Sequence, residues 1–142
     1  MLVLFPGSFD PFTDGHANIV KRALRLFDGV VVAVGENSDK RYLFSSEERV
    51  QKIAERYADE PRVRVVCYSD MTVDCCRRCG CGAIVRGVRN AQDWEYESTV
   101  AAVNQRLAPD IETVLLPADT DLRDISSTLE REKLLHASNK TN

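Results

Sequence analysis

Apolar runs alternate with amphipathic segments along most of the chain, which is the pattern of an α/β protein. The clearest runs are residues 1–5 and 29–35, and the second is a continuous β-branched run typical of a strand buried on both faces. Three further strands are expected at residues 63–68, 83–85 and 112–116. Five strands separated by helix-forming segments predict a parallel sheet with helical crossovers.

The segments between these strands carry helix signals. Residues 17–27 place their apolar side chains at helical spacing and their basic ones outside. A second helix opens at Ser45, whose side chain is expected to pair with Glu48 in a capping box. The remaining helices are expected from Thr72 to Cys79, from Gln92 to Leu107, and from about Ser126 onward.

These elements predict a single domain over residues 1–142, with a five-stranded, doubly wound parallel sheet of the Rossmann-like kind. In such a sheet the functional site lies at the carboxyl ends of the strands. The polar end of the chain, residues 137–142, is expected to be a disordered tail.

The most specific motif follows the first strand, where residues 6–16 read PGSFDPFTDGH. A strand, a tight glycine turn and a helix start form a phosphate site, because free backbone N–H groups and the positive helix end meet there. Gly7 lets the backbone approach a phosphate closely, and Thr13 or Asp14 is placed to cap the helix. His16 then projects from the first helical turn toward the anion; the alternative is that His16 only caps the helix.

Three more polar clusters follow expected strands or open helices. Lys40, after the second strand, is either a phosphate ligand or a solvated loop charge. Arg86 and Arg89 flank a glycine after the fourth strand and offer forked donors to a nucleotide. Residues 125–128, which read ISST, open the last helix with three hydroxyls, as a second anion site or a plain serine cap.

Composition narrows the classes of function. The chain has 142 residues, of which 44% are hydrophobic and 29% charged, as expected for a globular domain. Its 19 basic and 22 acidic residues give a net charge of −3, so no global field attracts nucleic acid or an anionic membrane. No apolar run approaches the ~20 residues of a membrane span, and the start of the chain lacks the basic region of a signal peptide. We expect a cytoplasmic protein that binds phosphates through a local cluster.

Four of the five cysteines fall close together, at Cys75, Cys76, Cys79 and Cys81. Cys76 and Cys79 have the spacing of a zinc motif, but no second pair lies at a matching distance in the sequence. A structural disulfide is disfavoured in a reducing cytoplasm. The cysteines are therefore interpreted as packing residues beside the sheet, with a metal site as the alternative.

The motif at residues 6–16 resembles the (H/T)xGH signature of the nucleotidylyltransferase superfamily, with Thr13 in the first polar place and His16 in the last. Further pieces, in order over nearly the whole chain, are similar to bacterial phosphopantetheine adenylyltransferases. They are the Lys40 loop, Phe44 with residues 47–49, Ser69-Asp70, RGVRNAQDWEYE at residues 86–97, Asn104 and ISST. The block at residues 86–97 separates this family from others that share the first motif.

The resemblance implies transfer of AMP from ATP to 4′-phosphopantetheine, which gives dephospho-coenzyme A and pyrophosphate in coenzyme A biosynthesis. It also implies a homohexamer and a Mg²⁺ cofactor, which is expected to bridge phosphate oxygens without dedicated protein ligands. The residues that the resemblance places at phosphopantetheine are Ser8, Lys40, Thr72, Arg86, Asn104 and Glu132. Those that it places at ATP are Ser8, Phe9, His16, Gly87, Val88, Arg89, Glu97, Leu122, Arg123, Asp124, Ile125, Ser126, Ser127 and Thr128.

His16, Lys40 and Arg86 are the expected catalytic residues. Phosphoryl transfer needs positioned groups and neutralised charge rather than a protein nucleophile. His16 is therefore expected to donate to the transition-state oxygens and not to act as a general base. Lys40 and Arg86 would hold two mutually repelling phosphates together, and residues 126–128 with Arg89 would orient the triphosphate.

The chain departs from the family pattern at a few positions. Leu122 and Asp124 stand where the family usually carries aromatic residues, so a looser adenine pocket is expected, and Thr72 replaces a commonly apolar residue. Two other functions stay open. GSFDP and ISST also resemble nicotinate-mononucleotide adenylyltransferase, and a nucleotide-binding module without turnover is the alternative from a different class.

Overall fold

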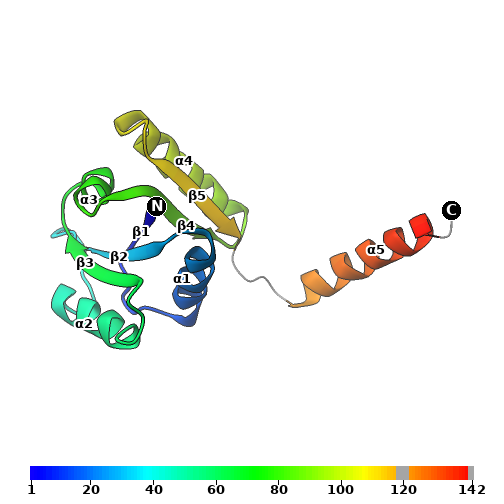
Figure 1. The fold of residues 1–142 in the computed structure, drawn as a ribbon, viewed down its shortest axis with the longest axis horizontal. Helices are drawn as coiled ribbons and strands as arrows, with labels where there is room; N and C mark the ends of the chain where they lie inside the picture. Colours follow the sequence, from blue (N-terminus) through cyan, green and yellow to red (C-terminus); the bar gives the residue numbers. More distant parts are fainter. Residues whose placement is uncertain (118–121, 141–142) are drawn as a thin grey trace.

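The computed structural model describes residues 1–117 and 122–140, with side chains for residues 1–117 and 128–137. Strands and helices alternate throughout (Figure 1). In chain order the elements are β1 (Leu2–Gly7), α1 (Asp14–Leu26), β2 (Gly29–Gly35), α2 (Ser46–Arg56), β3 (Val63–Tyr68), α3 (Thr72–Arg78), β4 (Cys81–Val88), α4 (Ala91–Leu107), β5 (Glu112–Pro117) and α5 (Leu122–Lys140).

The five strands form one parallel sheet in the order β3-β2-β1-β4-β5. The chain starts at the centre with β1, builds to one edge through β2 and β3, and then returns to add β4 and β5. This reversal creates a crevice outside the carboxyl ends of β1 and β4, where open α/β sheets bind their ligands. The doubly wound parallel sheet predicted from the sequence is confirmed.

Apolar side chains pack on both faces of the sheet. On one face, alternate residues of the central strands meet Ile19, Val20 and Ala23 of α1 and Ile53 of α2. On the other face they meet α3 and the end of α4, through Val73 and other buried side chains. Figure 1 shows α1 and α2 on one side of the sheet and α3 and α4 on the other. Strand β2 is buried at every position except the last, as its continuous apolar run predicts.

Several element boundaries differ from the sequence prediction, and the following differences have a clear cause or bear on the site. Helix α1 begins at Asp14, three residues before the apolar spacing starts, because Thr13 caps it. Strand β4 runs on to Val88, since its backbone pairs with β5 as far as Pro117, so Arg86 lies within a strand and not after one. Helix α5 begins at Leu122 and not near Ser126.

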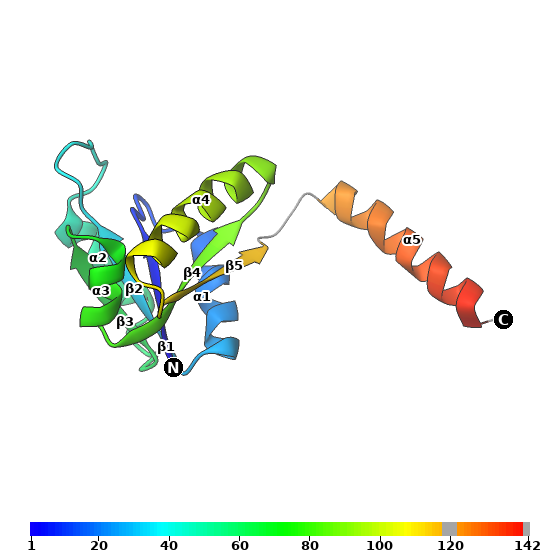
Figure 2. The same ribbon diagram turned by 90° about the horizontal axis from the view of Figure 1, so that it is seen from above.

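The end of the chain stands apart from the rest. Figures 1 and 2 both show α5 clear of the sheet and of the other helices. Its backbone is helical to Lys140, so residues 137–140 of the expected tail continue the helix, and residues 141–142 lie outside the described part. Among the described residues, no helix has both the length and the apolar character that crossing a bilayer requires.

Candidate active site

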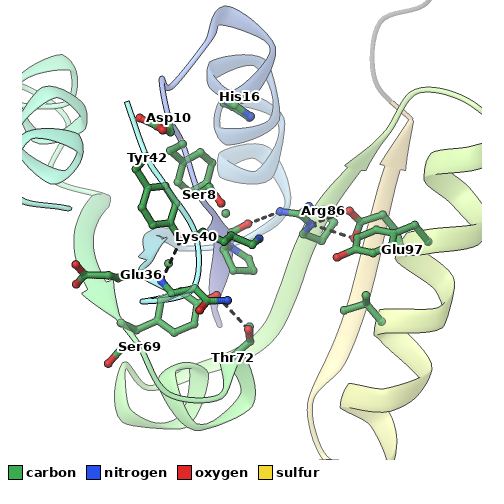
Figure 3. A pocket seen from close by; sticks show the side chains of 18 of the residues that line it. Ser8, Asp10, His16, Glu36, Lys40, Tyr42, Ser69, Thr72, Arg86 and Glu97 are labelled. Atoms are coloured by element: carbon green, nitrogen blue, oxygen red, sulfur yellow. Dashed lines mark hydrogen bonds and ion pairs between the residues drawn. The ribbon is translucent and has the colours of Figure 1, made fainter. Parts of the chain in front are cut away.

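A cavity of about 1190 Å³ opens at the carboxyl ends of the strands. Figure 3 shows polar side chains from several elements around this one space. Eight of the residues that the resemblance places at a substrate line it, namely Ser8, Phe9, His16, Lys40, Thr72, Arg86, Glu97 and Asn104. The fold thus brings together side chains that are up to 96 positions apart, the separation between residues 8 and 104.

The turn after β1 is shaped by the contact of Gly7 with Phe9. A Cβ atom on Gly7 would lie 2.8 Å from Cζ of the Phe9 ring, so only glycine leaves room for that ring. Phe9 has a φ of 49°, a backbone conformation that side chains rarely adopt, and is buried. Strained backbone of this kind concentrates at binding sites, where the surrounding packing maintains it. The buried ring holds the turn, and Ser8 is left exposed beside it.

His16 closes the start of α1 with Thr13, and this contact fixes the proton on its ring. The backbone N–H of Thr13 donates to Nδ1 of His16 at 2.9 Å, while the backbone N–H of His16 donates to the Thr13 hydroxyl at 3.4 Å. Since Nδ1 accepts, the neutral ring carries its hydrogen on Nε2. The helix cap uses Nδ1 and leaves the N–H of Nε2 free of that contact, so the two roles that the sequence offered as alternatives are compatible. Donation from His16 to an anion stays a prediction.

The electrostatic surroundings keep His16 neutral. Burial lowers the pKa of His16 below its ordinary value, and the positive charges of Arg86 and Arg89 lower it further. The ring also packs edge-on against Phe9, with 5.0 Å between ring centroids. A neutral, fixed imidazole supplies one N–H donor beside the cavity and no further charge.

Arg86 and Glu97 form the strongest ion pair of the cavity. Nε of Arg86 donates to both carboxylate oxygens of Glu97, at 3.1 and 3.0 Å, and Nη2 donates to Oε1 at 2.7 Å. Its Nη1 donates to the backbone carbonyl of Pro6. Burial opposes the charge of Arg86, but the hydrogen bonds and charge of Glu97 outweigh it, so the pKa of Arg86 is raised.

This pair fixes the role that each partner can take. Glu97, which the resemblance places at ATP, has a side chain that is only 7% exposed. Both of its carboxylate oxygens accept hydrogen bonds from Arg86. It holds the guanidinium of β4 in place from α4, as Figure 3 shows. One hydrogen each on Nη1 and Nη2 stays available for a phosphate oxygen, because a guanidinium has five N–H donors.

Lys40 reaches the cavity from the loop between β2 and α2. Its backbone N–H donates to the carbonyl of Asn37 at 3.0 Å, which closes a turn in that loop. Within the described part of the chain, no carboxylate lies within ion-pair distance of its ammonium. Its neighbour Arg41 does not line the cavity. Lys40 thus lines the cavity while its side chain is exposed, and its contact with a phosphate stays a prediction.

The far end of the cavity is lined by α3 and α4. Thr72, the first residue of α3, shares a hydrogen bond of 3.1 Å with the hydroxyl of Tyr68 at the end of β3. Asn104 faces the cavity from α4. These positions agree with the places that the resemblance gave Thr72 and Asn104, while contact with phosphopantetheine stays a prediction.

Sequence reasoning missed several lining residues. Asp10, Glu36, Tyr42, Tyr68 and Tyr96 all border the cavity. Four of them lie in or just after a strand end or in the loop that follows, so the rule that sites form at carboxyl strand ends would have found them. Tyr96 lies on α4, and only the packing of that helix shows which of its sides faces the cavity.

Other expected site residues lie outside the cavity lining. Gly87 and Val88 end β4, and Arg89 is exposed and pairs with Asp93 at 3.6 Å. Glu132 and Thr128 are exposed on α5, which stands away from the cavity in Figures 1 and 2. The side chains of Leu122, Arg123, Asp124, Ile125, Ser126 and Ser127 lie outside the described residues.

The cysteine cluster lies on the opposite side of α3 from solvent. Cys75, Cys76 and Cys81 are buried in the apolar core that α3 covers. The thiol of Cys76 donates weakly to the carbonyls of Cys81 and Ala83, at 3.5 and 3.7 Å. Burial raises the pKa of Cys75 to about 12, which keeps that thiol protonated. This environment supports the packing interpretation, and the absence of bound zinc stays a prediction.

Comparisons with known proteins agree with this geometry. The model of the cytidylyltransferase-like family matches residues 4–133. A phosphopantetheine adenylyltransferase of Porphyromonas gingivalis is 51% identical over 131 residues, covering 92% of this chain and 85% of that protein. A phosphopantetheine adenylyltransferase of Flavobacterium psychrophilum is 44% identical over 129 residues, covering 91% and 85%.

Solved structures support the fold at lower identity. A bifunctional NMN adenylyltransferase/ADP ribose pyrophosphatase of Francisella tularensis superposes with a TM-score of 0.65 and 19% identity, over 85% of this chain and 39% of that one. A lipopolysaccharide core biosynthesis protein of Thermoplasma volcanium gives 0.61 and 21%, over 84% and 96%. With the strand-end cavity, the neutral histidine and this similarity over most of the sequence, the chain belongs to the phosphopantetheine adenylyltransferase family of nucleotidyltransferases.

Proposed function

We propose that this chain transfers AMP from ATP to 4′-phosphopantetheine, releasing pyrophosphate. The observation that carries the proposal is one cavity holding the Nε2–H donor of His16, the ammonium of Lys40 and the anchored guanidinium of Arg86. No protein nucleophile is required, because the acceptor phosphate itself attacks the α-phosphorus. The acceptor phosphate and the triphosphate of ATP repel each other. Fixed cations that bind both of them lower the free energy needed to bring them together.

The donors divide the work by position. Lys40 lies on the β2 side and would bind the acceptor phosphate, and Arg86 lies between β1 and α4. His16 donates to an oxygen of the pentacoordinate phosphorus, where negative charge grows in the transition state. A neutral ring suits this role, because it donates without drawing the ground-state phosphates toward itself as a full charge would.

We infer that Mg²⁺ assists the reaction. Among the described residues, no group of three histidine, cysteine or acidic side chains is arranged to hold a metal ion. A magnesium ion bound there would therefore take most of its ligands from phosphate oxygens and water, as this ion commonly does. When bound, it supplies charge neutralisation on the triphosphate.

We also propose that α5 completes the ATP side of the site and that the protein forms a homohexamer in the cytoplasm. Exposed apolar side chains on α4 and α5 support assembly, among them Trp94, Val103 and Leu134. Five free cysteines suit a reducing compartment. Sedimentation of the purified chain would measure the number of subunits directly.

Pyrophosphate release tests the proposed reaction. The assay compares phosphopantetheine, nicotinate mononucleotide and no acceptor, each with ATP and Mg²⁺. Release that requires phosphopantetheine supports the proposal. Release with nicotinate mononucleotide alone would assign the other adenylyltransferase activity, and no release with either acceptor would leave a nucleotide-binding module.

A further inference from the structure

The peptide unit of Phe44 is held from both sides. Its N–H donates to Oδ1 of Asp10 at 2.9 Å, and the N–H of the preceding Leu43 donates to Oδ2 at 2.6 Å. Its carbonyl accepts from Nε of Arg49 at 3.2 Å. Asp10 lies in the phosphate turn, 33 positions before Leu43 in the sequence. These bonds therefore connect the turn to the loop that carries Lys40.

Arg49 joins the same loop to the ends of two strands. Its Nη1 donates to the carbonyl of Ser8, just after β1, at 2.7 Å and to the carbonyl of Gly35, the last residue of β2, at 2.9 Å. Arg49 is only 1% exposed, and no carboxylate pairs with it among the described residues. A buried guanidinium is costly unless its hydrogen bonds are made. Nε and Nη1 of Arg49 make such bonds, whereas its Nη2 is buried and has no hydrogen-bond partner among the described residues.

The Lys40 loop closes over this guanidinium. The ring of Tyr42 lies 4.0 Å from the guanidinium carbon of Arg49, at cation–π distance. The Tyr42 hydroxyl accepts from the backbone N–H of Asn37 at 3.0 Å, so the ring bridges the start and the end of the loop. Lys40 stands between these two anchors, and Figure 3 shows Asp10, Tyr42 and Lys40 at the same side of the cavity.

We propose that Asp10 and Arg49 are positioning residues for Lys40: they fix the loop of residues 37–44 to the phosphate turn, so that the ammonium meets the acceptor phosphate. Neither acts on the reacting atoms. Both carboxylate oxygens of Asp10 are engaged by amides, and Arg49 is buried beneath the loop. The proposal rests on the proposed function for its kinetic test, and on the fold alone for its structural test.

A double-mutant cycle gives the kinetic test. Asp10→Asn keeps the side-chain shape but replaces one acceptor with a donor, which faces an N–H group. If Asp10 acts through Lys40, Asp10→Asn should lower kcat/KM for phosphopantetheine about fivefold in the wild-type chain and less than about twofold in the Lys40→Met chain. KM for ATP should stay within about twofold in both.

The matched control is Asp39→Asn. It removes one negative charge from the Lys40 loop itself, as Asp10→Asn does from the phosphate turn. Asp39 lies outside the cavity lining, and among the described residues only its backbone is hydrogen-bonded, to the Asn37 side chain. This variant should keep wild-type kinetics. An equal loss in Asp10→Asn and Asp39→Asn would assign the effect to charge alone and overturn the positioning role.

Trypsin gives a test that does not depend on activity. The loop carries its own cleavage sites, after Lys40 and after Arg41, and both residues are exposed. Trypsin should cleave the Asp10→Asn and Arg49→Lys variants faster at these sites than it cleaves the wild type and Asp39→Asn. Mass spectrometry of the fragments measures the rates. Tyr42→Phe, which removes only the hydroxyl bridge to Asn37, carries the same test if the first two variants fold poorly.

The outcomes separate the two proposals. Equal losses from Asp10→Asn with and without Lys40, or loop cleavage unchanged in all three variants, would overturn the positioning role. A wild-type chain that releases no pyrophosphate with phosphopantetheine would overturn the proposed function. The cleavage rates would still show whether Asp10 and Arg49 fix the loop of residues 37–44.

Discussion

The acceptor side of the cavity and helix α5 are built on different terms. On the acceptor side, the candidate side chains come from the sheet, from helices packed on it or from a loop bonded to its neighbours. Arg86, for example, is held by Glu97 of α4. On α5, the interaction resolved between side chains is His136 with Glu132 at 4.0 Å, within the helix itself. Leu129, Leu134 and Leu135 of this helix are exposed.

The comparison indicates which part of the proposed site the folded chain organises by itself. Side chains that are fixed before the substrate arrives cost little to order on binding, and those on a separate helix must be ordered then. We therefore expect acceptor binding to depend on the sheet and its loops, and ATP use to depend on movement or assembly that brings α5 to the cavity.

The largest effect is expected at the centre of the organised side. His16→Ala should lower kcat about 100-fold to 1000-fold, the usual result of losing one transition-state donor. ATP affinity should change far less, since the ground state loses only one neutral hydrogen bond. Steady-state kinetics of pyrophosphate release measure both, with His136→Ala as the control histidine. Unchanged turnover would show that the capping box is the only role of His16.

The next effect tests whether α5 reaches the cavity. Replacing Ser126 and Ser127 together by alanine should lower kcat/KM for ATP by roughly 10-fold to 100-fold, because hydrogen bonds to charged phosphates are strong. The dissociation constant for phosphopantetheine, measured by calorimetry, should stay close to wild type. Ser138→Ala, near the end of the same helix, is the control. Wild-type kinetics in the double variant would mean that α5 works outside catalysis.

A smaller effect distinguishes two neighbours in one loop. Lys40→Met should lower kcat/KM for phosphopantetheine more than about tenfold, which corresponds to ~1.4 kcal/mol of transition-state stabilisation. An exposed ion pair contributes at most about 1 kcal/mol, so this loss would indicate a cavity that excludes water. Arg41→Met should have little effect. Similar small losses at both positions would return Lys40 to the solvated-charge interpretation.

The smallest effect concerns stability against pH. Burial, followed by Arg86 and Arg89, lowers the pKa of His16 in the folded chain from 6.5. The unfolded chain then binds the proton more readily than the folded one. The contribution of His16 to the free energy of unfolding is therefore complete above pH 6.5 and is lost as the pH falls through the lower pKa of the folded chain. Protonation also removes the acceptor for the N–H of Thr13.

Urea unfolding of wild type and His16→Ala, from about pH 8 to about pH 5, measures this contribution. The free energy of unfolding of the wild type should fall more steeply toward acid than that of the variant. Parallel curves for the two chains would contradict the lowered pKa.

Whether a feature could be predicted from the sequence depends on how far apart in the chain its interacting residues lie. The phosphate turn was predictable because Gly7, Thr13 and His16 act on backbone within a few residues of themselves. The cap at Ser45 was found for the same reason, since its side chain accepts from Glu48 three residues on. The boundary of β4 was missed, because pairing with β5 and not its own apolar pattern extends it.

The sequence alone determined the order of strands and helices, the parallel sheet, the phosphate turn and the family. These features depend on apolar periodicity and on local hydrogen bonds, and both involve residues that are close together in the sequence. Tertiary structure decided that Glu97 serves Arg86, that Nδ1 of His16 accepts its hydrogen bond, and that Asp10 and Arg49 secure the Lys40 loop. Apart from the local contacts of His16 with Thr13 and of Arg49 with Phe44, these bonds join residues between 11 and 41 positions apart. Only the packing of elements against the sheet brings such groups together.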